Sequence, residues 1–240
     1  MGGLSAKHRR DGLALRAPAA LGVIMLETRF PRLPGDIGNA NSFAWPVRYR
    51  VVKGASPMRV IKGRAEGLLA PFVGAARELA AEGCAAITTS CGFLALYQRE
   101  LAAAVDVPLA TSSLCQIASV ASGLPQGRRV GVVTIAADAL GVDHLLAVGA
   151  DPATPVVGVA PDGEFVRAIL GDRPSLDPAL LEGEVLEAGR RLLAGYPEVG
   201  AIVLECTNMP PYAGALRCAT GLPVYDVLTL AAGLMARSSG

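Results

Sequence analysis

The feature that most constrains the fold is a repeat, because two parts of the chain match without a gap when one is shifted by 115 residues. In each part a short apolar run leads to a cysteine, and Cys91 and Cys206 fall on the same position of the repeat. The other coincident pairs are Ala86 with Ala201, Ile87 with Ile202, Tyr97 with Tyr212, Leu101 with Leu216, and Pro108 with Pro223. Two thiols at equivalent points of related half-domains can face each other across a cleft.

Short β-branched runs alternate with longer runs rich in Ala and Leu, which predicts strand–helix–strand units and mostly parallel sheets. The predicted strands cover residues 21–26, 85–89, 107–110, 129–134, 154–159, 200–204 and 224–226. The predicted helices cover residues 64–82, 93–105, 136–148, 163–170, 178–195, 210–220 and 228–237. We therefore expect an α/β fold of two similar lobes related by a pseudo-twofold axis, each a mostly parallel sheet flanked by helices. The site should lie in the cleft between the lobes.

The repeat also suggests where the chain divides. We expect a tail over residues 1–20, a first lobe over 21–127 and a second lobe over 128–240, with room for the chain to cross back to the first lobe near the C-terminus. Residues 27–59 are rich in Pro, Gly, Asn and Arg, and they predict a lid or binding loop, or otherwise a surface excursion.

The composition of the chain argues against several classes of function. A formal net charge of +1 gives no electrostatic case for nucleic acid. The apolar runs are shorter than the roughly 18–20 residues that a membrane-spanning helix needs. The odd count of five cysteines, with no CxxC pair and two histidines, argues against a disulfide scaffold and against a zinc site. These features predict a cytoplasmic protein with free thiols and neither a nucleic-acid nor a membrane partner.

The sequence also argues against cofactors. None of the three lysines follows a clear strand in a phosphate-binding setting, as a pyridoxal phosphate enzyme would require. No GxGxxG motif opens a helix after a strand, and no P-loop is present. A Cys–His hydrolase using His144 has no supporting motif. We therefore expect no cofactor and no metal.

Cys91 and Cys206 each stand where a buried strand ends and a helix should begin, and ligands of open α/β sheets bind at such strand ends. Because helix N-termini present unpaired N–H groups, we expect a thiol pKa lowered from about 8.5 toward neutrality. The backbone N–H groups predicted to hold a carboxylate there are those of Gly92, Phe93, Thr207 and Asn208, with the hydroxyls of Ser90 and Thr207 as further donors. Cys84, Cys115 and Cys218 are interpreted as packing residues, since free cysteine behaves as a small hydrophobe.

The motifs Ser90-Cys91-Gly92 and Glu205-Cys206-Thr207-Asn208 resemble those of the aspartate/glutamate racemase superfamily, which includes hydantoin racemase, maleate cis-trans isomerase and arylmalonate decarboxylase. The likeness covers about residues 20 to 237. It implies a catalytic pair formed by Cys91 and Cys206, carboxylate-binding turns at Gly92, Thr207 and Asn208, and, more loosely, a substrate-facing loop at Ser112 and Ser113. Thr134, at the end of the strand predicted over residues 129–134, is a further candidate substrate-binding residue.

Two departures from the superfamily bear on the substrate. Cys91-Gly92-Phe93 replaces the Cys-Asn-Thr that amino-acid racemases of the superfamily usually carry, so Phe93 suggests a less polar pocket. Arg29, at the end of the first strand, is predicted either to clamp a second carboxylate or to form a surface ion pair.

The resemblance implies a cofactor-independent racemase or other isomerase that acts on a small carboxylate, such as an amino acid or a hydantoin. One thiolate would take the α-proton and the other thiol would return a proton on the opposite face. The alternatives are a maleate-isomerase-like or arylmalonate-decarboxylase-like cysteine enzyme, and a non-enzymatic small-acid binding or redox protein. The resemblance to this superfamily also suggests a homodimer.

Overall fold

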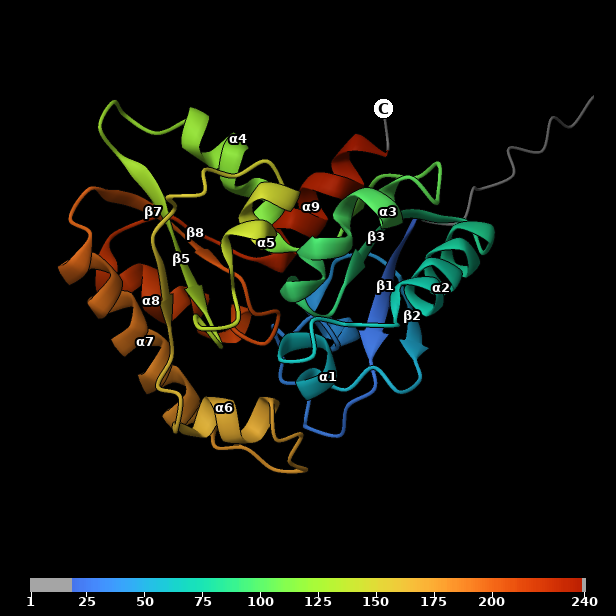
Figure 1. Ribbon diagram of the computed structural model, residues 1–240, viewed down its shortest axis with the longest axis horizontal. Coiled ribbons are helices and arrows are strands. Elements are labelled where there is room, and N and C mark those ends of the chain that lie inside the picture. Colours follow the sequence, from blue (N-terminus) through green and yellow to red (C-terminus); the bar gives the residue numbers. More distant parts are fainter. Residues whose placement is uncertain (1–18, 239–240) are drawn as a thin grey trace, which may run out of the picture.

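Two parallel four-stranded sheets stand side by side in the computed structural model, which describes residues 19–238 (Figure 1). The first sheet has the order β2-β1-β3-β4, with β1 at Ala20–Leu26, β2 at Val47–Val52, β3 at Cys84–Thr89 and β4 at Leu109–Ala110. The second has the order β6-β5-β7-β8, with β5 at Arg129–Thr134, β6 at Val156–Gly158, β7 at Val199–Leu204 and β8 at Val224–Tyr225. The same strand order in both sheets confirms the predicted α/β fold of two similar lobes.

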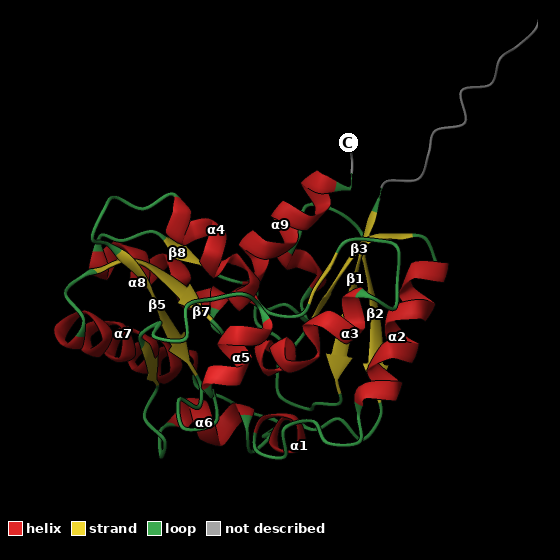
Figure 2. Ribbon diagram, turned by 45° about the horizontal axis from the view of Figure 1, so that its top comes forward, coloured by secondary structure: helices red, strands yellow, loops and turns green. Residues whose placement is uncertain are grey.

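Helices cover the faces of both sheets, so that α2 lies along the first sheet and α7 along the second (Figure 2). The α-helices are α1 Pro57–Ile61, α2 Leu69–Ala81, α3 Gln98–Ala102, α4 Ile117–Ser122, α5 Val142–Ala147, α6 Glu164–Ile169, α7 Pro178–Gly195, α8 Ala213–Thr220 and α9 Val227–Arg237. Short 3-10 helices are η1 Ala40–Ser42, η2 Gly92–Tyr97, η3 Ser113–Gln116 and η4 Pro210–Tyr212. Helix α9 packs against β3, so the end of the chain returns to the first lobe.

The central strands are apolar throughout because helices bury both of their faces. All seven residues of β1 and all six of β7 are buried. Full burial of side chains such as Ile24 and Val203 contributes about 1.5–3 kcal/mol each. The two core strands therefore place their carboxyl ends rigidly, and the candidate site lies at those ends.

The interpretation of residues 27–59 as a loop is wrong in part, because the segment contains η1, β2 and the start of α1. Strand β2 lies at the sheet edge and pairs in parallel with β1. Its arginines Arg48 and Arg50 form ion pairs with Glu82 on the neighbouring turn after α2. Charges that alternate along a half-exposed edge strand hide the apolar pattern by which strands are recognised.

Three predicted helices are clearly shorter than expected, and the one predicted over residues 136–148 is reduced to α5 at Val142–Ala147. The segment predicted to start a helix at residue 64 turns first, because Arg64 and Ala65 have positive φ angles of 52° and 53°, and α2 begins only at Leu69. The helix expected over 93–105 is the 3-10 helix η2 followed by the short α3.

The predicted tail over residues 1–20 lies outside the described residues apart from its last two positions, of which Ala20 already belongs to β1. Between residues 19 and 238, no helix combines the length and the apolar character needed to cross a bilayer.

Candidate active site

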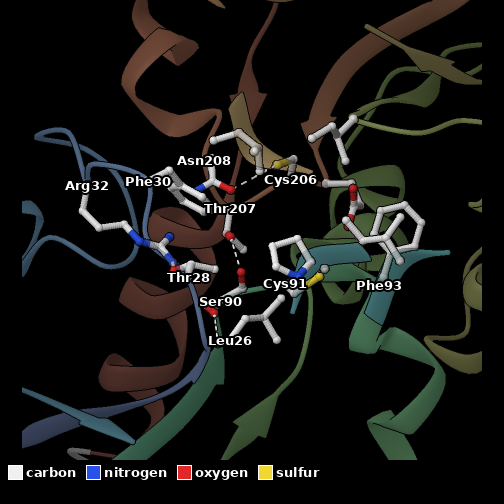
Figure 3. Close-up of a pocket in the computed structure, with 16 residues that line it drawn as sticks. Leu26, Thr28, Phe30, Arg32, Ser90, Cys91, Phe93, Cys206, Thr207 and Asn208 are labelled. Carbon is white, nitrogen blue, oxygen red and sulfur yellow. Dashed lines mark hydrogen bonds between the residues drawn. The ribbon is translucent and has the colours of Figure 1, made fainter. Parts of the chain in front are cut away.

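Cys91 and Cys206 line one pocket at the junction of the lobes (Figure 3). Cys91 follows β3 and caps the N-terminus of η2, while Cys206 comes two residues after the end of β7. Each residue is 6% exposed, and both are free thiols. The two halves of the repeat therefore bring their cysteines into a single buried space.

A backbone N–H group in the turn after each cysteine favours ionisation of the thiol, but burial opposes it. The backbone N–H of Phe93 points at the Cys91 thiol, and that of Asn208 at the Cys206 thiol, which favours the thiolates. Burial raises both pKa values more strongly, and the nearby Glu205 carboxyl raises them further. The expectation of thiol pKa values near neutrality is therefore wrong, because removal from water outweighs the N–H groups of the turns.

Five of the predicted binding residues, Ser90, Gly92, Phe93, Thr207 and Asn208, line the pocket. Their polar side chains already have partners. The Thr207 hydroxyl donates to the backbone oxygen of Ser90 at 2.7 Å, and Ser90 Oγ accepts from the N–H of Leu26 at 2.8 Å. The Asn208 amide donates to Asp36 at 2.5 Å. The bonds of Thr207 and Asn208 join the two lobes around the pocket, whereas the bond between Leu26 and Ser90 lies within the first lobe.

The other four predicted binding residues lie outside this pocket. Arg29 is 75% exposed in its side chain and is engaged by Asp172, which matches the surface ion pair left open by the sequence. The Ser112 hydroxyl caps η3, and Ser113 Oγ donates to the backbone oxygen of Leu204 at 2.6 Å. Thr134 is connected to the pocket only through Glu205. The Thr134 hydroxyl donates a hydrogen bond to the Glu205 carboxyl, and Glu205 lines the pocket.

No role was predicted for Arg32 from the sequence, yet its guanidinium reaches the pocket. The side chain is 15% exposed and donates to Asp36 at 3.1 Å and to Thr28 at 2.7 Å. It also lies over the ring of Phe30, 4.3 Å from the centroid. Only the path of the loop after β1 decides that Arg32, rather than Arg29, turns inward, so no sequence signal distinguishes the two.

Glu205 is the second charged residue without an assigned role. It is 1% exposed, and its Oε2 accepts the Thr134 hydroxyl at 2.6 Å, whereas Oε1 has no hydrogen-bond partner. Burial raises the pKa of Glu205 to about 7, against the opposing effect of the Thr134 hydrogen bond. A sequence signal existed, since a carboxyl group that directly follows six apolar strand residues is unusual at a buried strand end.

The pocket is nearly closed, with room of about 20 Å³. That is about the space of one water molecule. Ile135 and Ile169 of the second lobe and Ile61 of the first contribute apolar walls. A substrate larger than water therefore requires the pocket to widen.

No family model matches the chain. It is 31% identical over 220 residues to the dimethylsulfoniopropionate lyase of Durusdinium sp. clade D, covering 89% of this chain and 73% of that protein. It is 32% identical to dimethylsulfoniopropionate lyase 7 and 30% identical to lyase 6 of Emiliania huxleyi (strain CCMP1516), over 88% and 90% of this chain. The chain spans 64% and 59% of the length of those two relatives.

Solved structures with the same fold include allantoin racemase from Klebsiella pneumoniae, with a TM-score of 0.64 at 17% identity over 91% of this chain and 86% of that one. Arylmalonate decarboxylase has a TM-score of 0.60 at 16% identity, over 92% of each chain. A putative Asp/Glu racemase from Yersinia pestis has a TM-score of 0.58 at 14% identity, over 92% of this chain and all of that one. The fold is that of the aspartate/glutamate/hydantoin racemase superfamily, as the cysteine motifs predicted.

The prediction of a racemase or other isomerase is wrong, because the relatives that match along most of the chain are lyases. The cysteine motifs identify a superfamily whose members share a fold and differ in reaction, so they could not fix the chemistry. By its similarity to these relatives, the chain belongs to the dimethylsulfoniopropionate lyase family.

Proposed function

We propose that the chain is a lyase that cleaves dimethylsulfoniopropionate by β-elimination to give dimethyl sulfide and acrylate. The observation that carries the proposal is the pair of buried thiols in one pocket of a chain that is 31% identical to such a lyase. The substrate carries a carboxylate and a dimethylsulfonium group on adjacent carbons. The α-proton and the leaving group are therefore on two carbons joined by a single bond, as β-elimination requires.

The reaction needs one base. A cysteine thiolate takes the proton from the carbon next to the carboxylate, and the C–H electron pair becomes the new carbon–carbon double bond. The pair of the breaking C–S bond goes to sulfur, which leaves as neutral dimethyl sulfide. Because the leaving group departs without a proton, no acid is required at that end, in contrast to the two-base scheme of a racemase.

The substrate itself can help to ionise the thiol. The pKa values of the Cys91 and Cys206 thiols are raised by burial, so the empty pocket favours the neutral thiols. A sulfonium cation close to a thiol favours the thiolate, with release of the thiol proton to solvent, since an opposite charge within a few ångströms stabilises the ionised form. The N–H groups of Phe93 and Asn208 then stabilise the thiolate that forms.

Arg32 is the residue we assign to the substrate carboxylate. Its guanidinium makes hydrogen bonds to Asp36 and Thr28 and has further N–H donors left. It also lies close enough to Cys91 to favour the thiolate. A cation held against the carboxylate stabilises the enolate-like charge that builds up as the α-proton leaves.

The test is to incubate the purified protein with dimethylsulfoniopropionate and to measure dimethyl sulfide by headspace gas chromatography and acrylate by NMR. We expect release of both products in equal amounts. Of Cys91→Ala and Cys206→Ala, the variant that lacks the base should lose about 10²–10⁴-fold in rate, and the other should lose less. Cys218→Ala is the matched control, because Cys218 is an exposed free thiol on α8.

Absence of dimethyl sulfide with the wild-type protein would rule out the lyase. Wild-type rates in both single cysteine variants would rule out a thiol base.

A further inference from the structure

The pocket has charged groups of opposite sign on opposite sides. In Figure 3, Arg32 and Phe93 lie on opposite sides of the pocket, with Cys91 and Cys206 between them. Glu205 lies on the Phe93 side, because its carboxyl is packed against Gly92, the residue before Phe93. A cation and a carboxyl therefore flank the two thiols.

Gly92 leaves the space that the carboxyl of Glu205 occupies. A Cβ atom at position 92 would overlap both Oε1 and the backbone oxygen of Glu205. The hydroxyl of Thr134 fixes the other oxygen, Oε2, at 2.6 Å. The carboxyl is thus held in one orientation, with Oε1 against the turn that carries Cys91.

Oε1 has no partner in the protein although Glu205 is 1% exposed. A buried carboxylate oxygen without a hydrogen bond or a cation costs free energy, so such groups are normally paired. No side-chain cation pairs with Glu205 among the described residues, since Arg32 is bound to Asp36. The site therefore contains an uncompensated acidic group that faces the reactive thiols.

We propose that Glu205 recognises the onium cation of the substrate and so makes the pocket selective for zwitterionic acids. The inference rests on the proposed lyase function. The substrate carboxylate lies toward Arg32, and the dimethylsulfonium group lies toward Oε1 of Glu205, beside Phe93. A sulfonium has no N–H or O–H donor, so it would compensate the charge on Oε1 without forming a hydrogen bond.

The test compares two unreactive probes of the same shape. One is 3-(trimethylammonio)propanoate, which carries a cation, and the other is 4,4-dimethylpentanoate, in which carbon replaces the charged nitrogen. Calorimetry should show that the wild-type protein binds the cationic probe about tenfold or more tightly than the neutral one, as expected for a desolvated charge pair. In Glu205→Gln the ratio should fall to about one, mainly because the cationic probe binds more weakly.

Glu182→Gln is the matched control, since Glu182 is exposed on α7. It should keep the wild-type ratio. The ratio is measured without turnover, so it is independent of whether dimethyl sulfide is released. A wild-type protein without preference for the cation, or a Glu205→Gln variant that keeps the preference, would overturn the inference even if the lyase activity is found.

A second measurement needs no variant. Because the pKa of Glu205 is about 7, the preference for the cationic probe should rise roughly fourfold between pH 6.5 and pH 8.5, as the ionised fraction rises. In the empty pocket the raised pKa values keep the Cys91 and Cys206 thiols neutral, and the guanidinium of Arg32 is bound to Asp36.

Two further groups complete the surroundings of Glu205. His144 contacts the ring of Phe93, and burial lowers its pKa, which favours the neutral imidazole. The carboxylate of Asp36 is bound by Arg32 and Asn208. A preference that does not change with pH would contradict the role of Glu205.

Discussion

Arg32 and Glu205 place opposite charges in a pocket that has room for about one water molecule. Arg32 is compensated within the protein by Asp36, whereas Glu205 has only the neutral hydroxyl of Thr134. Glu205 therefore destabilises the folded state more than Arg32 does, because a buried carboxylate without a cation favours its protonated form. Residues that cost stability in this way are typical of functional sites.

Glu205 should make the stability of the protein depend on pH. Its pKa rises from 4.5 to about 7 on folding, so between these values the folded state binds the proton more strongly than the unfolded state. The free energy of unfolding therefore falls as pH rises through this window, by about 3 kcal/mol in total from this group. Urea unfolding at pH 4.5 and pH 8 should show that Glu205→Gln gains stability relative to wild type at the higher pH.

Glu182→Gln should follow the wild-type pH dependence in the same experiment, because its carboxyl is exposed. An identical pH dependence in Glu205→Gln and wild type would show that Glu205 does not hold a proton in the folded protein.

Arg32 and Arg29 form a matched pair for testing which arginine serves the substrate. Arg32→Lys keeps the charge but loses the planar fork that binds carboxylates with two parallel hydrogen bonds. We expect kcat/KM for dimethylsulfoniopropionate to fall roughly 10- to 100-fold, mainly through KM. Arg29→Lys should stay within about twofold, because an exposed ion pair contributes little. Equal effects of the two changes would remove Arg32 from the site.

At the scale of elements, the site forms where the turn after β3 meets the turn after β7. The Thr207 hydroxyl donates to the backbone oxygen of Ser90, and Ser113 Oγ donates to that of Leu204, so the strand ends of the two lobes are bonded to each other. Such close approach of two turns requires a residue without a side chain at the contact. Gly92 occupies that position.

Gly92→Ala tests this contact. The added Cβ would overlap Glu205, and the backbone atoms there cannot move aside as a flexible side chain could. We expect a loss of about 1–3 kcal/mol in the free energy of unfolding and loss of activity. Gly74→Ala in α2 is the control, since nothing lies within 4 Å of its Cβ position and alanine favours helix by up to about 1 kcal/mol. Thermal unfolding of both variants would decide, and a stable, active Gly92→Ala would contradict the close contact.

At the scale of the whole molecule, the small pocket that holds the thiols must widen to admit a substrate, and separation of the two lobes would widen it. Three exposed ion pairs join the lobes, formed by Arg29 with Asp172, Lys62 with Asp138, and Arg64 with Asp143. Exposed pairs contribute about 0.2–1 kcal/mol each, so together they can bias a closed state without locking it. The expected homodimer stays a prediction.

The double variant Asp138→Asn with Asp172→Asn should favour the open state. We expect alkylation of Cys91 and Cys206 by iodoacetamide, followed by peptide mass spectrometry, to become roughly two- to tenfold faster. The control is Glu100→Gln with Glu187→Gln, which removes two ion pairs that each lie within a single lobe. Equal alkylation rates in the two double variants would show that the ion pairs do not hold the lobes together.

The sequence determined the architecture of this protein. The apolar strand runs, the Ala- and Leu-rich runs and the 115-residue repeat are visible in the sequence, so they predicted the strands of both sheets apart from β2 and placed Cys91 and Cys206 at equivalent strand ends. The edge strand β2 was missed because its alternating arginines look like a polar loop. The reaction was also predicted wrongly, since turns with the same backbone geometry serve more than one chemistry.

Tertiary structure alone decided what surrounds the thiols. Whether Arg29 or Arg32 faces inward depends on the path of a loop, and the raised pKa of Glu205 depends on how completely the second lobe and the turn at Gly92 exclude water. Burial and charge at a site are sums over contacts between residues far apart in the chain. A sequence can therefore indicate which groups are available, but only packing sets their orientation and their protonation.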